Sequence, residues 1–108
     1  MANETYKLFP ETLRSLAGPF TGSYQAIGTP LVNPSQIIKF TNNSNVDVTL
    51  SWDGVNDHGF IPAGSFTLLD VTTNSETGDA IYIQAKLQFY VKATGGTGSF
   101  YIESYFTQ

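Results

Sequence analysis

The amino-acid sequence predicts an all-β protein: an antiparallel β-sandwich, jelly-roll or Ig-like, with about seven or eight short strands. Three observations favour this class. From residue 23 onward, apolar and polar residues alternate with a period of two, as they do in half-buried strands. Stretches rich in Asn, Ser and Gly separate the alternating runs and are typical of turns. Charged residues make up only 13% of the chain, so Thr, Asn, Ser and Gln supply most of its polar surface.

The chain of 108 residues is long enough for one domain with one hydrophobic core. We divide it into an N-terminal arm or short helix at 1–21 and a β-sandwich at 22–108, which contains every expected strand. "PETLRSLAG" (10–18) predicts the helix, because proline suits a first helical turn, two leucines lie three residues apart and a glycine can end it. Such a short helix needs a surface to dock on, either its own domain or a neighbouring subunit.

The expected strands lie at 24–32, 35–42, 46–54, 65–71, 80–93 and 98–106, with an extended link at 59–64. The first run contains a glycine and a proline, so we expect it at an edge or a bulge. The longest run can form one bent strand or two. Alternation in the clearest run places Trp52 on the apolar face with Val48 and Leu50, so we predict that Trp52 anchors the core.

The segment "DGVNDHG" (53–59) contains the only histidine, His58. Its spacing does not fit an EF-hand calcium loop, and zinc would need further ligands. A hydrolase triad would need a converging serine, and the motif that flanks a nucleophile is absent. Asp-Gly is a strong turn dipeptide, so we interpret the segment as a structural turn with His58 on the surface. A cation held by Asp53, Asn56 and Asp57 is the open alternative. We therefore predict no catalytic, cofactor-binding or metal-ligating residue, and no enzyme.

The charge pattern argues against nucleic acid as a partner. The net charge is −4, the pI is near 4.6, and no basic residue lies between Lys39 and Lys86, whereas binding to phosphates requires basic patches. No apolar run approaches the ~20 residues of a membrane span. "MANETYKLFP" lacks the apolar region of a signal peptide, and without cysteine there are no disulfides. We expect no membrane partner and no cofactor.

Three stretches carry a resemblance to a known class of protein. They are "FTNNSNVDVTLSWDG" (40–54), "IPAG" (61–64) before a strand that ends in Asp, and "YVKATGGTGSFYI" (90–102). In this order they resemble small β-sandwich virion proteins of tailed bacteriophages, such as capsid decoration or cement proteins and head–tail or tail components. The resemblance implies a structural component that binds capsid, portal-proximal or tail subunits without catalysis. It implies a homo-oligomer or many copies per particle, made in the host cytoplasm and located in the virion.

The last strands offer a candidate protein interface. Alternation there places tyrosines on the face opposite the apolar residues, and aromatic residues are enriched at interfaces. Together with apolar residues of the N-terminal segment, the candidate interface residues are Leu8, Phe9, Leu13, Leu16, Tyr90, Tyr101 and Tyr105. The alternative is that the domain itself covers both of its sheet faces.

Two other functions compete with the virion component. A carbohydrate-binding β-sandwich module would stack exposed Trp or Tyr on sugar rings, but the only Trp, Trp52, falls on the apolar face. A small hydrolase is disfavoured because there is one histidine and no nucleophile motif.

Overall fold

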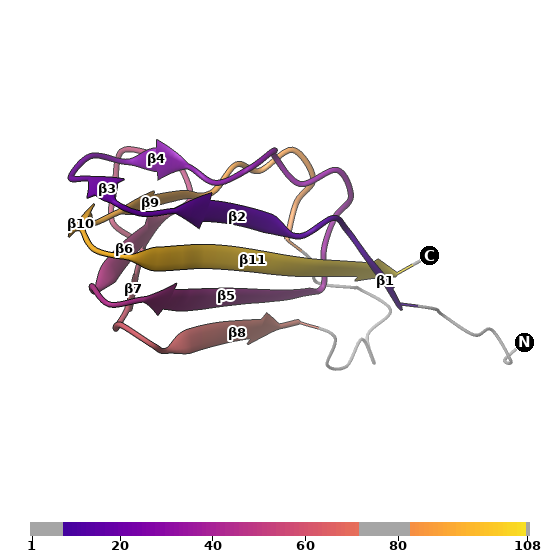
Figure 1. Ribbon diagram of the computed structural model, residues 1–108. Helices are drawn as coiled ribbons and strands as arrows, with labels where there is room; N and C mark the ends of the chain where they lie inside the picture. Colours follow the sequence, from indigo (N-terminus) through magenta and orange to yellow (C-terminus); the bar gives the residue numbers. More distant parts are fainter. Residues whose placement is uncertain (1–7, 72–82, 108) are drawn as a thin grey trace, which may run out of the picture.

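Figure 1 shows the computed structural model, which describes residues 8–71 and 83–107. This part of the chain is all-β and antiparallel, which confirms the predicted fold class. Two sheets, here called the large sheet and the small sheet, pack against each other around the core (Figure 1). No helix among the described residues is long and apolar enough to cross a membrane.

The large sheet contains five strands. They are β1 (Leu8–Pro10), β2 (Arg14–Ala17), β5 (Ile37–Ser44), β8 (Phe66–Asp70) and β11 (Gly98–Thr107). β11 pairs with β5 along almost its whole length, and β5 pairs with β8 at the edge. On the other side of β11, β2 and β1 pair one after the other and together form the opposite edge (Figure 1).

The small sheet has the order β4-β9-β6-β7, and a two-stranded ribbon joins β3 to β10. These strands are β3 (Phe20–Thr21), β4 (Gln25–Ala26), β6 (Val48–Ser51), β7 (Gly59–Ile61), β9 (Tyr90–Lys92) and β10 (Thr94–Gly95). The first predicted run yields only the two residues of β4. The run predicted at 80–93 yields β9 and one bridge between Ile83 and Ser35, while residues 80–82 lie outside the described part.

The core lies between the two sheets and is centred on aromatic rings. Phe40 of β5 and Phe89, the residue before β9, are both buried, with ring centroids 5.1 Å apart in an edge-to-face arrangement. Trp52 follows β6 and packs edge-to-face on Phe89 at 5.4 Å. Trp52 is only half-buried, so it closes the border of the core rather than filling its centre. Such aromatic pairs contribute beyond the area that they bury.

The predicted helix over 10–18 is wrong. Arg14–Ala17 form β2, in which Leu16 lies across from Phe100 of β11. Leu16 packs against the core, whereas Leu13 points outward and is 54% exposed. Residues 8–21 thus supply β1, β2 and β3 to the sheets instead of a separate helix.

A buried arginine holds the N-terminal strand in place. Arg14 is 5% exposed and lies on the core side of β2. Its Nε donates to the carbonyl of Thr29 at 2.6 Å, and its Nη2 donates to the carbonyl of Pro30 at 2.9 Å. Its Nη1 donates to the hydroxyl of Ser104 on β11 at 3.1 Å. One side chain therefore links β2, the 29–33 loop and β11.

Glu11 balances the charge of Arg14. The two side chains, each 5% exposed, form an ion pair of 2.8 Å. Glu11 also accepts hydrogen bonds from the backbone and side-chain nitrogens of Asn33, at 2.7 and 2.9 Å, and from the Val32 backbone. Burial raises the pKa of Glu11, but the hydrogen bonds from Arg14, Asn33 and Val32 together outweigh it, so the pKa lies below its usual 4.5.

We predict that a chain lacking residues 1–20 does not fold. The deletion removes β1, β2, Arg14 and the buried Phe20. Loss of a buried Phe side chain alone costs about 3–5 kcal/mol, against a total of about 5–15 kcal/mol for a small domain. Thermal melting followed by circular dichroism measures the outcome. A chain lacking only residues 1–7 keeps every described strand and is the control; cooperative melting of the longer deletion would contradict the prediction.

We also predict that stability falls in acid because of Glu11. Its pKa is lower in the folded state than in the unfolded state, so ionised Glu11 stabilises the fold above about pH 4.5, and this contribution is lost as the pH falls through the folded-state pKa. Glu11→Gln removes the titration and leaves Arg14 without its counter-charge. At pH 7 we expect the variant to be less stable by about 1–3 kcal/mol, with a shallower loss between pH 5 and pH 3. Equal pH dependence of variant and parent in denaturant titrations would contradict this.

Candidate functional site

The outer face of the large sheet is the best candidate for a functional surface. Along β11, Phe100, Ile102 and Ser104 are buried, so Tyr101, Glu103 and Tyr105 point to the outer side. The strand register places Tyr101 beside Thr41 of β5 and Thr41 beside Phe66 of β8. The next row brings together Glu103, Lys39 and Leu68 in the same way. The resulting face, called here the outer face, joins aromatic, aliphatic and charged side chains.

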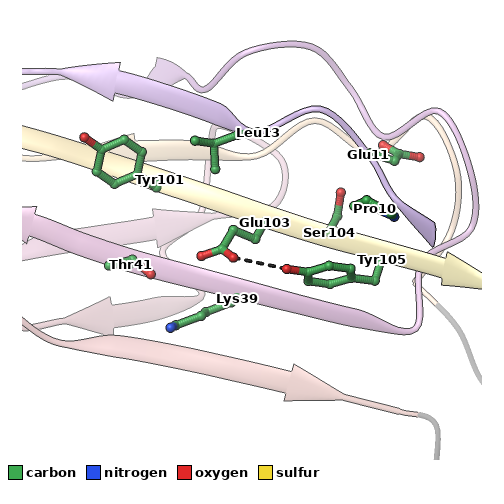
Figure 2. Close-up of a pocket in the computed structure, with 9 residues that line it drawn as sticks. All are labelled: Pro10, Glu11, Leu13, Lys39, Thr41, Tyr101, Glu103, Ser104 and Tyr105. Atoms are coloured by element: carbon green, nitrogen blue, oxygen red, sulfur yellow. Dashed lines mark hydrogen bonds between the residues drawn. The ribbon is translucent and has the colours of Figure 1, made fainter. Parts of the chain in front are cut away.

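A hollow of about 530 Å³ lies in this face (Figure 2). Its floor is formed by β11 and β5, and one wall by the segment between β1 and β2. The lining residues are Pro10, Glu11, Leu13, Lys39, Thr41, Tyr101, Glu103, Ser104 and Tyr105. Figure 2 shows Tyr101 toward one end of the hollow, with Glu103 between it and Tyr105. The hollow is open enough to receive side chains of another molecule.

The polar groups of the hollow differ in how far they are satisfied. The Tyr105 hydroxyl donates to Glu103 Oε1 at 3.2 Å, and this hydrogen bond, with desolvation and the carboxylate charge, raises the pKa of Tyr105. The Thr41 hydroxyl oxygen is buried and has no hydrogen-bond partner among the described residues. Lys39 Nζ lies 4.6 Å above the ring of Phe66. Glu11 is committed to Arg14 and Asn33 and offers little to a ligand.

The lining of the hollow combines aromatic, apolar and charged side chains. Histidine and cysteine are missing from the lining, and the described residues contain no cluster of three His, Asp or Glu side chains that could hold a metal ion. Aromatic rings beside Lys39 and Glu103 suit recognition of a mixed polar and apolar surface, and tyrosine is enriched among the residues that contribute most to such contacts. The outer face therefore fits a protein or another extended polymer.

The 53–59 segment is a turn, as predicted. Both oxygens of Asp53 accept hydrogen bonds within the loop, from the backbones of Asn56 and Val55 and from the Asn56 side chain. The Asn56 and Val55 backbone groups hold the pKa of Asp53 well below its usual range. Asp57 pairs with Lys92 at 3.2 Å. Of the side chains proposed as cation ligands, Asp53 thus shapes the loop and Asp57 is engaged by Lys92.

His58 and Trp52 close this loop together. His58 is exposed, as predicted, but its Nδ1 accepts a hydrogen bond of 2.9 Å from the Trp52 backbone. The His58 backbone donates in turn to the carbonyl of Leu50 at 2.8 Å. His58 therefore has a structural role in the turn that the sequence did not reveal.

Tyr90 does not share a surface with the other two tyrosines. It lies on β9 in the small sheet, where the Gly54 loop packs on its ring: a Cβ added at Gly54 would come within 3.2 Å of it. Tyr101 and Tyr105 lie together on the outer face, as predicted. The hypothesis of one stripe through all three residues is wrong, because the chain places Tyr90 in a different sheet.

The N-terminal candidates divide between the two sides of the large sheet. Leu8 and Leu13 are exposed, and Leu13 lines the hollow. Phe9 stacks on Phe106 at 5.7 Å, and Leu16 packs on the core, so neither contributes to the hollow. The predicted interface did not include Lys39, Thr41, Glu103, Phe66 and Leu68, although alternation in their strands was the signal that could have placed them on the outer face.

Comparison with known proteins adds no identification. The chain matches no protein-family model, no curated protein and no solved structure. The function therefore has to be inferred from the fold and the outer face.

We predict a clear contrast between substitutions at Trp52 and His58. Trp52→Ala removes the ring that covers Phe89 and should destabilise the protein by about 3 kcal/mol. His58→Ala removes one hydrogen bond at an exposed loop and should cost about 1 kcal/mol, with fold and assembly intact. Chemical denaturation of both variants measures the difference. A His58→Ala protein that folds normally but loses all function would contradict the turn interpretation.

Proposed function

We propose that this protein is a non-catalytic structural subunit that binds other protein subunits through its outer face, in the virion of a tailed bacteriophage. The observation that carries the binding role is the hollow in the outer face, lined by Tyr101, Tyr105 and Leu13. The virion setting rests on the resemblance of 40–54, 61–64 and 90–102 to small β-sandwich virion proteins.

Exposure and composition support a protein partner. The outer face exposes three large apolar side chains, Leu13, Phe66 and Leu68, which are 54%, 59% and 52% exposed. The solvent face of an antiparallel sheet is usually polar, so this exposure favours a face that another protein covers. The chain as a whole has few charged residues, which lowers the cost of covering its surface with neighbours. Binding in many copies would multiply a modest contact into stable attachment.

A carbohydrate-binding module is the second candidate. The observation that favours it is the grouping of Tyr101 with Thr41, Lys39 and Glu103 around one hollow, since aromatic rings stack on sugars while polar groups bind hydroxyls. Trp52 does not contribute, because its ring packs on Phe89.

We predict that Tyr101→Lys abolishes attachment without unfolding the protein. The side chain is half-buried on the outer face, and the substitution removes the ring from the contact and adds an ammonium group that docking would have to desolvate. We expect incorporation into purified particles of the encoding phage to fall on the order of tenfold or more, with melting nearly unchanged. Phe60→Lys is the matched control, because Phe60 is an exposed aromatic residue of the small sheet.

Three results would count against the proposal. Normal incorporation of Tyr101→Lys would show that the outer face is not the surface that binds the particle. Absence of the wild-type protein from purified particles would remove the virion setting. Retardation of the wild type, but not of Tyr101→Lys, in polysaccharide gels would favour the carbohydrate-binding module.

A further inference from the structure

Among the described residues, no strand pairs with the outer edge of β8 at Phe66 and Leu68. Within the described part of the chain, β8 pairs only with β5. The Asn42 backbone donates to the carbonyl of Ser65, and the Val71 backbone donates to the carbonyl of Gln36, both at 2.8 Å. Backbone groups alternate in direction along a strand, so those of the odd-numbered residues 65–71 point to β5. The N–H and C=O groups of Phe66 and Leu68 therefore point away from the sheet.

Within β8 itself the usual protections of such an edge are missing, although a bulge lies just before the strand, where Gly64 and Ser65 both bond the backbone of Asn42. Natural edge strands carry lysine, proline or a bulge that prevents pairing with another chain. β8 runs Phe-Thr-Leu-Leu-Asp, without proline or lysine, and no Asp, Glu, Lys or Arg lies between His58 and Asp70. The edge and its exposed side chains are thus suited to a further strand.

We propose that this strand is β8 of a second copy of the chain, paired antiparallel about a two-fold axis at Thr67. In this register Phe66 of each copy exchanges two backbone hydrogen bonds with Leu68 of the other copy. The two symmetric pairs together give four hydrogen bonds. Thr67 faces Thr67 of the partner as a non-hydrogen-bonded pair. The two-fold symmetry makes the contact closed, so it yields a dimer and not a fibre.

Side-chain complementarity argues for a second copy. Phe66 and Leu68 lie on the outer face. In the dimer, Phe66 of each copy would pack against Leu68 of the other copy. Like charges do not meet, because Asp70 falls opposite Gly64 of the partner, where an added side chain would have open space. The Lys39 ammonium group already lies over the ring of Phe66 and is the charged group next to the apolar side chains of β8.

The neighbouring register is less favourable. Pairing about Leu68 would set Phe66 opposite Asp70 of the partner and so place a carboxylate against an aromatic ring. The Thr67-centred register instead buries two apolar pairs. It also brings both outer faces to the same side of a continuous sheet, so the dimer would present two hollows to one partner surface. That last consequence rests on the proposed function, whereas the pairing itself does not.

Single cysteines test the pairing and its register, because the natural chain has none. Thr67→Cys would place two thiols across a pair with Cα atoms about 4.5 Å apart, within disulfide range. Leu68→Cys would place them roughly 8–9 Å apart, out of range. Val55→Cys, at a residue 75% exposed in the 52–58 loop, reports random collision. Each purified variant is oxidised mildly at the same concentration, and dimers are measured on non-reducing gels.

We expect Thr67→Cys to cross-link at least tenfold faster than either control. Faster cross-linking of Leu68→Cys would overturn the Thr67-centred register. A Thr67→Cys rate no greater than that of Val55→Cys would overturn the dimer. Because these measurements need no particle, a cross-linked dimer combined with normal incorporation of Tyr101→Lys would refute the proposed function alone.

Discussion

The buried guanidinium of Arg14 is the constraint on which the arrangement of the large sheet depends. A charged group in a core is costly unless its charge and its donors are satisfied. Arg14 meets this requirement with carbonyls of the 29–33 loop, the Ser104 hydroxyl and Glu11. Those partners come from three separate parts of the chain. The N-terminal strand can therefore dock in only one position on β11, since any shift along the strand would leave a buried charge without its partners.

This constraint makes the two edges of the large sheet unequal. On one side β1 and β2 cover β11, and the Arg14 cluster fastens the 29–33 loop beside them. On the other side the sheet ends at β8, which carries exposed Phe66 and Leu68. The turn at 62–65 joins β7 directly to β8, so the edges of both sheets lie on that same side. Arg14 thus fastens a loop beside one edge of the large sheet, whereas β8 forms the other edge among the described residues.

Alternation made the sandwich predictable, and an inward-facing arginine concealed one strand. In β2 the residues Arg14 and Leu16 face the core, while Ser15 faces outward, as does Leu13 just before the strand. A charged residue at an inward position breaks the apolar period of two, and two leucines three residues apart then imitate a helix. Only the tertiary partners of Arg14 stabilise the strand, and no local pattern predicts them.

The candidate site shows the same limit. Alternation correctly placed Tyr101 and Tyr105 on the outer side of β11, because each residue's side is fixed by its position in the strand. It also placed Tyr90 outward, but it could not show that the Gly54 loop folds over that ring. Similarly, the hollow needs Lys39 and Thr41 from a strand that is distant in the sequence, and the pairing of β5 with β11 supplies them.

The contrast between the sheets explains why the outer face of the large sheet is the stronger binding candidate. On the small sheet, the 52–58 loop covers Tyr90, and Lys92 is engaged by Asp57 and by the ring of Tyr24. Only part of its outward groups have partners within the domain, because the Tyr24 hydroxyl is buried without a hydrogen-bond partner among the described residues and Phe60 is 60% exposed. On the large sheet, the Thr41 hydroxyl lacks a partner among the described residues, and apolar side chains stay exposed. What distinguishes the large sheet is that several apolar side chains stay exposed on the face that contains the hollow, and this is why the outer face is the proposed binding surface.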